Sequence, residues 1–227
     1  MSERDAAKEL WRRAASDAAD HAEEMMRIGV HKQIVNRLLE PFSHINVVAT
    51  ATEWDNFFGL RLHRDAQPEM RALAIAMWEA YKASEPKLLK PGEWHLPFIS
   101  DSDAGAIIQS VVDAEWPEDT IDDRALEICR KVSVARCARV SYESFESGRR
   151  STVEEDLLLH DRLLGSQPLH ASPAEHQATP DTVGIPEYAD LTPPWMNRRG
   201  HGYLVGWRQY RKMLMGEAVA PIPEEFR

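Results

Sequence analysis

Residues 56–71 read Asn56-Phe57-Phe58-Gly59-Leu60-Arg61-Leu62-His63-Arg64-Asp65-Ala66-Gln67-Pro68-Glu69-Met70-Arg71. Asp65 is positioned to cap a helix here, because its carboxylate can accept hydrogen bonds from backbone amides that a first turn leaves unpaired. Downstream, apolar residues recur at three- and four-residue steps: Met70, Leu73, Ala74, Met77, Trp78 and Tyr81. The spacing predicts a helix with one buried face, so the charged cluster before it is attached to a rigid element.

The same stretch resembles a pattern in the late part of flavin-dependent thymidylate synthases, N-F-x-x-L-R-x-x-x-x-A-Q-x-E-[IM]. The matching residues are Asn56, Phe57, Leu60, Arg61, Ala66, Gln67, Glu69 and Met70. The resemblance implies that Arg61 contacts a deoxyuridine nucleotide and takes part in catalysis, and that Asn56 contacts the flavin. On composition alone, Arg61 and Arg64 would be solvated charges before a helix, and Asn56 would be a cap.

The length of 227 residues and the hydrophobic content of 43% predict one domain over residues 1–227. A formal net charge of −10 argues against general binding to nucleic acid, which needs many basic side chains on one face. No stretch approaches the apolar length of a membrane span, so no membrane partner is expected. Cys129 and Cys137 lack metal-site or disulfide spacing, and we interpret them as buried thiols in a cytoplasmic protein.

Two helices are predicted before the decisive stretch. Residues 2–28 form a long amphipathic helix that Gly29 ends, and residues 30–41 form a shorter one that Pro41 ends. The second resembles the family pattern G-[VI]-x-x-E-x-A-R-x-x-L-P, which implies that Arg37 contacts the substrate nucleotide, with Gln33 a second substrate-binding candidate on the same polar face. The alternative is that Arg37 pairs with Glu40 on the surface.

The segments on either side of the decisive stretch supply smaller signals. Thr52 is expected to cap a short helix that leads into it, and in the family polar or basic flavin-contacting residues often stand at the positions of Thr50 and Thr52. Residues 85–100 contain three prolines and predict a loop or short strand. Within them Trp94 and His95 are candidate pocket-lining residues, although simple packing is the alternative.

Residues 122–136 return to helical spacing, and residues 106–112 are expected to form a short buried segment. The helix leads into Cys137-Ala138-Arg139-Val140-Ser141-Tyr142, which resembles the early family pattern A-A-R-V-S-[FY]. The resemblance implies that Ser141 contacts the flavin and that Arg139 is structural. The alternative is an ordinary exit from a helix with one exposed arginine.

A further helix is predicted from Ser151, with Glu154 completing a capping box. After it, residues 169–176 resemble the family pattern G-H-x-[ST]-P-F-E-H. The resemblance implies a catalytic role for His170 and flavin contacts for Ser172 and Glu175. One alternative is a polar turn with a helix cap. The other is a zinc site formed by His170, Glu175 and His176. No metal is expected, because neighbouring side chains point in different directions and no fourth ligand is evident.

The final stretch, residues 195–217, mixes basic and aromatic side chains. Such a patch on an acidic protein could bind a nucleotide phosphate or a nucleic acid strand, or it could contact another subunit. The family signature R-H-R-x-x-S-x-N-E-x-S-x-R has no counterpart, and the closest string runs Arg208-Gln209-Tyr210-Arg211-Lys212.

Together, the resemblance covers residues 29–83, similar to the late region of the family, and residues 137–176, similar to its early region. Their order is reversed, so the chain looks like a circularly permuted, phage-like member. The resemblance implies an α+β, helix-rich domain with a small sheet, in a homotetramer or with a complementing chain. It implies methylation of dUMP with methylenetetrahydrofolate, FAD and NADPH. The alternatives are a nucleotide hydroxymethylase, an inactive flavin- and nucleotide-binding subunit, and a nucleic-acid-binding module.

Overall fold

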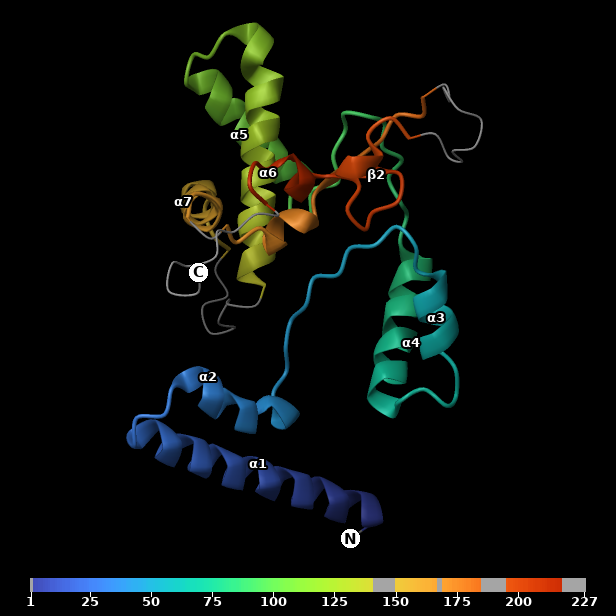
Figure 1. Cartoon of the computed structure of the whole chain (residues 1–227), viewed down its shortest axis with the longest axis vertical. Coiled ribbons are helices and arrows are strands. Elements are labelled where there is room, and N and C mark those ends of the chain that lie inside the picture. The colour runs from blue at the N-terminus through green and yellow to red at the C-terminus, as the bar shows by residue number, and fades with distance from the viewer. Residues whose placement is uncertain (1, 141–149, 167–168, 185–194, 218–227) are drawn as a thin grey trace, which may run out of the picture. The chain divides into compact units, whose positions relative to one another are not determined.

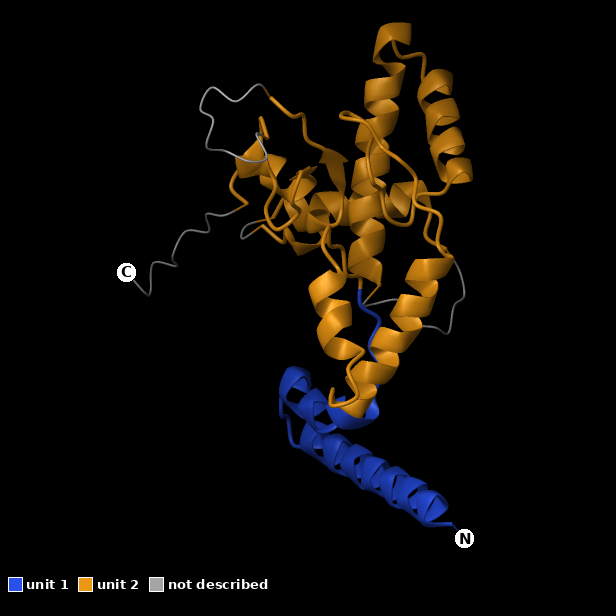
Figure 2. Cartoon of the chain, turned by 90° about the vertical axis from the view of Figure 1, so that its right-hand side faces the viewer, with its two compact units in different colours: residues 1–47 blue, residues 48–227 orange. Residues whose placement is uncertain are grey.

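The computed structural model describes residues 2–140, 150–166, 169–184 and 195–217. The chain divides into two compact units, residues 1–47 and residues 48–227 (Figure 2). Helices predominate and the described sheet has two short strands, which confirms the helix-rich α+β class. The single-domain organisation stays a prediction. Within the described part of the chain, no helix combines the length and apolar character that crossing a membrane requires.

The first unit is built on α1, Glu3–Arg27, and the predicted helix over residues 2–28 is confirmed. Its start is fixed by a capping box, in which the Ser2 hydroxyl accepts from the Asp5 amide (3.2 Å) and the Asp5 carboxylate accepts from the Ser2 amide (3.3 Å). Gly29 follows the helix with φ +88°, a conformation that glycine adopts without steric cost.

The second predicted helix, over residues 30–41, is wrong in its extent. The chain forms one short helix and two 3-10 turns: α2, Lys32–Val35; η1, Asn36–Leu38; and η2, Glu40–Phe42. Pro41 lies inside η2, whereas the α-helix ends at Val35, well before the proline that was predicted to end it. The Phe42 ring packs edge-on against Trp11 at 5.1 Å and joins these turns to α1.

In the second unit, the decisive stretch forms a helical hairpin of α3, Asp55–Arg61, and α4, Pro68–Ala83. Phe58 is buried at its centre, with ring centroids 4.9 Å from Trp78 and 5.7 Å from Tyr81. Because the rings come from both helices, burial of aromatic surface stabilises the hairpin.

Neither predicted cap of this hairpin forms. The residues before α3 and α4 are Trp54 and Gln67, and neither accepts a capping hydrogen bond through its side chain. Asp65 lies beside Arg64 at 3.5 Å instead, and Thr52 accepts from the Val205 amide at 3.0 Å. Pro68 begins α4, where its missing amide hydrogen costs nothing.

Three helices form the core of the second unit: α5, Asp101–Asp113; α6, Ile121–Arg139; and α7, Val153–Leu164. Figure 1 shows α6 as the long central helix, with α5 and α7 beside it. The core cluster comprises Ile107, Val111, Ala125, Cys129 and Val132. The predicted helix over residues 122–136 is confirmed, and the predicted buried segment over residues 106–112 is part of α5.

The capping box of α7 is formed by Thr152 and Glu155, one residue later than predicted. Both cysteines are buried and free, as interpreted from their spacing. Burial raises the pKa of Cys129 and raises that of Cys137 to about 12.

Two short antiparallel strands lie beside the helices: β1, Ala178–Pro180, and β2, Trp207–Gln209. In their register Ala178 faces Gln209 and Pro180 faces Trp207. His95 extends the pairing with one bridge, since its amide donates to the Ala178 carbonyl at 2.8 Å. The loop or short strand predicted for residues 85–100 is confirmed, and β2 forms within the basic aromatic stretch.

Candidate functional site

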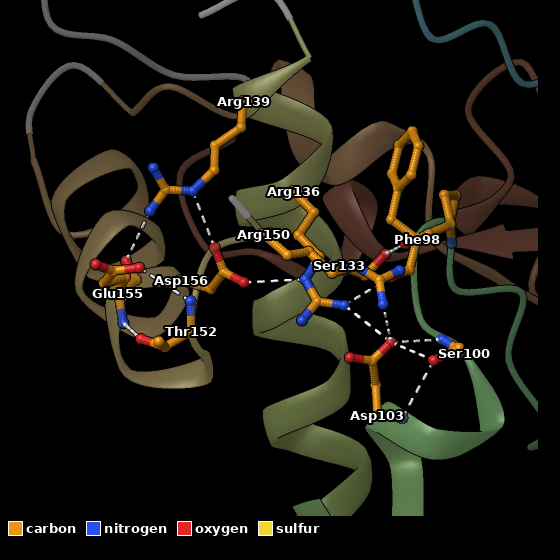
Figure 3. A network of polar contacts seen from close by, with 11 residues as sticks. Phe98, Ser100, Asp103, Ser133, Arg136, Arg139, Arg150, Thr152, Glu155 and Asp156 are labelled. Carbon is orange, nitrogen blue, oxygen red and sulfur yellow. Dashed lines mark hydrogen bonds and ion pairs between the residues drawn. The ribbon is translucent and has the colours of Figure 1, made fainter. Parts of the chain in front are cut away.

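A buried charge network joins α5, α6 and α7 (Figure 3). Asp156 is fully buried and accepts from Arg136 Nε at 3.0 Å and from Arg139 Nε at 2.9 Å. Arg136 Nη1 lies 3.1 Å from Asp103 and donates to the Phe98 carbonyl at 2.7 Å. Arg139 is therefore engaged inside the fold, in agreement with the structural role implied for it. Ser141, the flavin-contact candidate that follows, lies outside the described residues.

Two features of this network show how strongly the fold holds it. Phe98 adopts φ +64°, a left-handed conformation that costs a bulky residue free energy, and its carbonyl accepts from Arg136. Burial raises the pKa of Asp103, but hydrogen bonds from Ser100 and Arg136 outweigh burial and lower it to about 2. The three helices are thus tied together by ionised groups.

The turn after α7 carries the predicted flavin-side residues. It contains η4, Ser172–Glu175, which contacts α6. His170 and Ser172 are exposed, and the His170 amide donates to the Leu163 carbonyl at 3.1 Å. Glu175 is half-buried, and its carboxylate accepts from Arg211 Nη1 at 2.9 Å.

The basic aromatic stretch, residues 195–217, holds the turn after α7 in place through hydrogen bonds. Sequence reasoning missed this role. Gln209 is buried and its side-chain amide donates to the Glu175 carbonyl at 3.0 Å. The Tyr210 amide donates to the Gln177 carbonyl at 2.8 Å. Since Lys212 also pairs with Glu217 at 2.6 Å, part of the positive charge of this stretch is neutralised inside the unit. Trp207, Arg208 and Gln209 do not alternate between apolar and polar side chains, so the sequence carried no local signal for this strand.

A second polar cluster joins residues 181–182 to residues 197–206, which lie between β1 and β2 in the chain. The buried Asp181 carboxylate accepts from the amides of Thr182 and Asn197, from Asn197 Nδ2 and from His201 Nε2, each at 2.8 Å. His201 Nδ1 accepts a hydrogen bond from the Gly206 amide, so the imidazole hydrogen is on Nε2, which donates the hydrogen bond to Asp181. Burial raises the pKa of Asp181, but these hydrogen bonds outweigh burial and lower it to about 2.

A cavity of about 270 Å³ lies beside the clamped turn. Its lining residues are Thr50, Ala51, Thr52, His95, Ala178, Leu204 and Trp207. The Thr50 hydroxyl lies 3.2 Å from His176 Nδ1, which links the lining to the end of the turn. His95 therefore lines a pocket, as predicted, whereas Trp94 packs under the guanidinium of Arg130 at 4.8 Å.

The substrate-side candidates are exposed. Asn56 and Arg61 lie on α3, while Gln33 and Arg37 lie in the first unit on α2 and η1. Among the described residues, none forms a hydrogen bond or ion pair with the side chain of Arg61, and the alternative pairing of Arg37 with Glu40 is absent. Arg61 is thus a guanidinium available to a ligand.

The structure joins these candidates only in part. Asn56 and Arg61 share α3, and Ser172 and Glu175 share η4, but within the described ranges no hydrogen bond or ion pair connects the two pairs. No three His, Cys, Asp or Glu side chains are grouped to hold a metal ion in the part of the chain that is described.

We expect the free energy of unfolding to fall between pH 7 and pH 5. Burial lowers the pKa of His95, His160 and His176 in the fold, whereas the unfolded chain binds protons near pH 6.5. Below that pH the unfolded state takes up protons that the folded state does not. The three histidines therefore contribute to the free energy of unfolding above pH 6.5, and this contribution is lost as the pH falls. Urea unfolding at both pH values measures this. His160→Gln should reduce the change in the free energy of unfolding between the two pH values. The exposed His63→Gln is the control, and an equal reduction in that variant would contradict the explanation.

Comparisons with known proteins match one part of the chain. Residues 1–87 match the family model described as thymidylate synthase complementing protein. The flavin-dependent thymidylate synthase of Sulfolobus acidocaldarius is 36% identical over 85 residues, which is 37% of this chain and 33% of the relative. That of Saccharolobus solfataricus is 38% identical over 85 residues, with the same two shares of 37% and 33%. No solved structure gives a significant match to the chain.

The chain spans about a third of the length of the curated relatives it matches. The match confirms the resemblance for the part of the chain that contains Asn56 and Arg61. Residues 137–176 lie outside the segment matched by the family model, so the reversed order and the roles of His170, Ser172 and Glu175 stay predictions.

Proposed function

Because its first 87 residues match the thymidylate synthase complementing protein family, we propose that this chain acts in flavin-dependent methylation of dUMP to dTMP. Methylenetetrahydrofolate would donate the carbon, and NADPH would reduce FAD. The observation that carries the proposal is Arg61, an exposed guanidinium without an intramolecular partner among the described residues, in the matched segment. Relatives that match the chain are named flavin-dependent thymidylate synthases.

In this proposal the chain's own residues bind and orient the reactants. Arg61 and Arg37 bind the nucleotide, because a guanidinium donates two parallel hydrogen bonds to a phosphate or to a pyrimidine edge. Gln33 assists them, and His170 serves the catalytic step. The active site would be completed in a homotetramer or by a complementing chain.

The described flavin-side residues fit a polar cofactor edge. Asn56 and Ser172 are exposed and present hydrogen-bonding groups, and Glu175 is held in one orientation by Arg211. Ser141 completes the proposed set. FAD supplies the hydride chemistry when it is bound, while the protein supplies position and charge.

Binding of dUMP in the presence of FAD tests the proposal. We expect Arg61→Ala to weaken dUMP binding about tenfold or more, because a hydrogen bond to a charged group contributes about 1.5–3 kcal/mol. Arg64→Ala is the matched control, since Arg64 lies in the same stretch but beside Asp65 at 3.5 Å. Isothermal titration calorimetry measures both. Equal affinity in the parent and Arg61→Ala would contradict the assignment.

Product analysis then separates the alternatives. Mass spectrometry of the nucleotide after incubation with FAD, NADPH and methylenetetrahydrofolate should show dTMP. A hydroxymethylated nucleotide would indicate the hydroxymethylase instead. Binding of dUMP and FAD without turnover would indicate a subunit that needs a second chain.

A further inference from the structure

We propose that residues 44–52 form a β-strand that pairs antiparallel with the same residues of a second copy of this chain. The inference stands independently of the proposed function, because it concerns backbone hydrogen-bonding groups and involves no nucleotide or flavin. It assigns a contact surface to a segment that has no secondary structure in the single chain.

The sequence of this segment favours a strand. Residues 44–52 contain no glycine, no proline and no charged side chain, and five of the nine are β-branched: Ile45, Val47, Val48, Thr50 and Thr52. Such side chains are enriched in strands because they pack well on a pleated surface. The structure nevertheless gives these residues neither helix nor strand. A partner strand would remove this conflict between local preference and fold.

The backbone of the segment is unpaired. Among the described residues, no N–H or C=O group of residues 44–52 forms a backbone hydrogen bond. Side chains hold the second half of the segment instead: the Thr50 hydroxyl lies 3.2 Å from His176 Nδ1, and Thr52 Oγ1 accepts from the Val205 amide at 3.0 Å. A row of donors and acceptors presented in this way is the template that another strand recognises.

Exposure along the segment alternates as it does in a strand. Val48 and Thr50 are half-buried, whereas Val47, Ala49 and Ala51 are exposed. A period of two residues places successive side chains on opposite faces of an extended backbone. The cavity of about 270 Å³ borders residues 50–52, so open space lies beside this part of the backbone.

Charge points to the same segment of a second copy as the partner strand. Residues 41–52 contain no Asp, Glu, Lys or Arg, in a chain in which 28% of the residues are charged. Like charges that face each other destabilise a pair of strands, and two copies of this segment bring none together. The segment is therefore compatible with itself as a partner.

Side-chain size indicates the register. Antiparallel pairing about Val48 sets Ile45 opposite Ala51 and Val47 opposite Ala49, so each large side chain meets a small one. Ile45 is 79% exposed and Val47 is 72% exposed in the single chain, and the pairing would cover part of both. Because such a pair has two-fold symmetry, one surface serves both copies.

Sedimentation velocity of the full chain at several concentrations tests the inference. We expect the parent to self-associate, and Val48→Pro or Ala49→Pro to raise the dissociation constant about tenfold or more. Neighbouring residues of a strand donate to opposite edges, so one of these two amides lies between the paired strands, and symmetry removes its hydrogen bond twice. Ala49→Val is the matched control, because it keeps the amide and increases the preference for a strand.

Disulfide formation provides a second measurement, which does not depend on the proline variants. Val48→Cys should place two thiols directly opposite each other at the two-fold axis, so oxidation should link two copies covalently. Ala51→Cys is the control, because its two thiols would lie roughly 20 Å apart along the strands, at about 3.3 Å per residue. The parent should not cross-link, since Cys129 and Cys137 are buried.

Three results would overturn the inference. The first is a parent that stays monomeric at every concentration. The second is self-association that survives both proline variants, with circular dichroism spectra that match the parent. The third is cross-linking of Ala51→Cys as fast as that of Val48→Cys, which decides the matter if the proline variants fail to fold. Neither measurement includes a nucleotide or a flavin, so the outcome is separate from dUMP binding by Arg61.

Discussion

Asp156→Ala should lower the free energy of unfolding by about 3–5 kcal/mol, the usual cost of removing one partner from a buried ion pair. Asp156 is fully buried and accepts from the guanidinium groups of Arg136 and Arg139. Arg136 is itself only 7% exposed, so the substitution leaves a positive charge in the interior with only Asp103 and the Phe98 carbonyl as partners. Urea unfolding followed by tryptophan fluorescence and far-ultraviolet circular dichroism measures the change.

Glu154→Ala provides the control for that experiment. Glu154 is exposed and lies in the first turn of the same helix, α7, where a carboxylate contributes at most about 1 kcal/mol through the helix dipole. The helix therefore loses one acidic residue in each variant, but only Asp156→Ala removes a buried carboxylate that accepts from two arginines. Similar losses in the two variants would show that the network does not hold the helices together.

Asp181→Ala should lower the free energy of unfolding by about 3 kcal/mol or more, because each buried donor left without an acceptor costs about 1–3 kcal/mol. Four hydrogen bonds end on this one carboxylate, including the proton on His201 Nε2. Asp119→Ala changes an exposed carboxylate and should stay within about 0.5 kcal/mol of the parent. Denaturant unfolding of both variants decides the matter.

The dependence of the free energy of unfolding on pH gives a second, independent measurement of the contribution of Asp181. The pKa of Asp181 is about 2 in the fold, below the usual value near 3.9 in an unfolded chain. Its contribution is therefore fully present above about pH 4 and is lost as the pH falls toward 2. In the Asp181→Asn variant the free energy of unfolding should fall less between about pH 4 and pH 2 than it does in the parent. An unchanged slope would mean that other carboxylates, such as Asp103, carry the acid sensitivity.

The sequence predicted most of the long helices because their signals are local. A 3.6-residue apolar period and a terminal glycine defined α1, and the same period defined α4 and α6. The ends were less predictable. Asp65 and Thr52 have good capping side chains, but Thr52 is recruited by the Val205 amide, 153 residues away, which no local pattern encodes.

The site shows the same division between local and distant information. The pattern around Arg61 was identified from contiguous residues, and the family model matches that part of the chain. By contrast, Glu175 pairs with Arg211 across 36 residues, and Asp181 pairs with His201 across 20. Such pairs combine residue types that are common on surfaces, so composition could not distinguish them from solvated charges. For this reason the basic stretch predicted a nucleotide site, a nucleic-acid site or a subunit contact, and not the hydrogen bonds that it makes within the chain.

The two buried cysteines make the chain suited to site-specific chemistry. A thiol reacts with alkylating reagents as its thiolate, and burial raises the pKa of Cys137 to about 12, so its thiol stays protonated at pH 7. Cys129 is buried as well, and its pKa is also raised. A cysteine introduced at an exposed position such as Gly59 would then react selectively, without prior removal of the natural thiols. A fluorophore could be attached on α3, two residues from Arg61, in an otherwise unaltered protein.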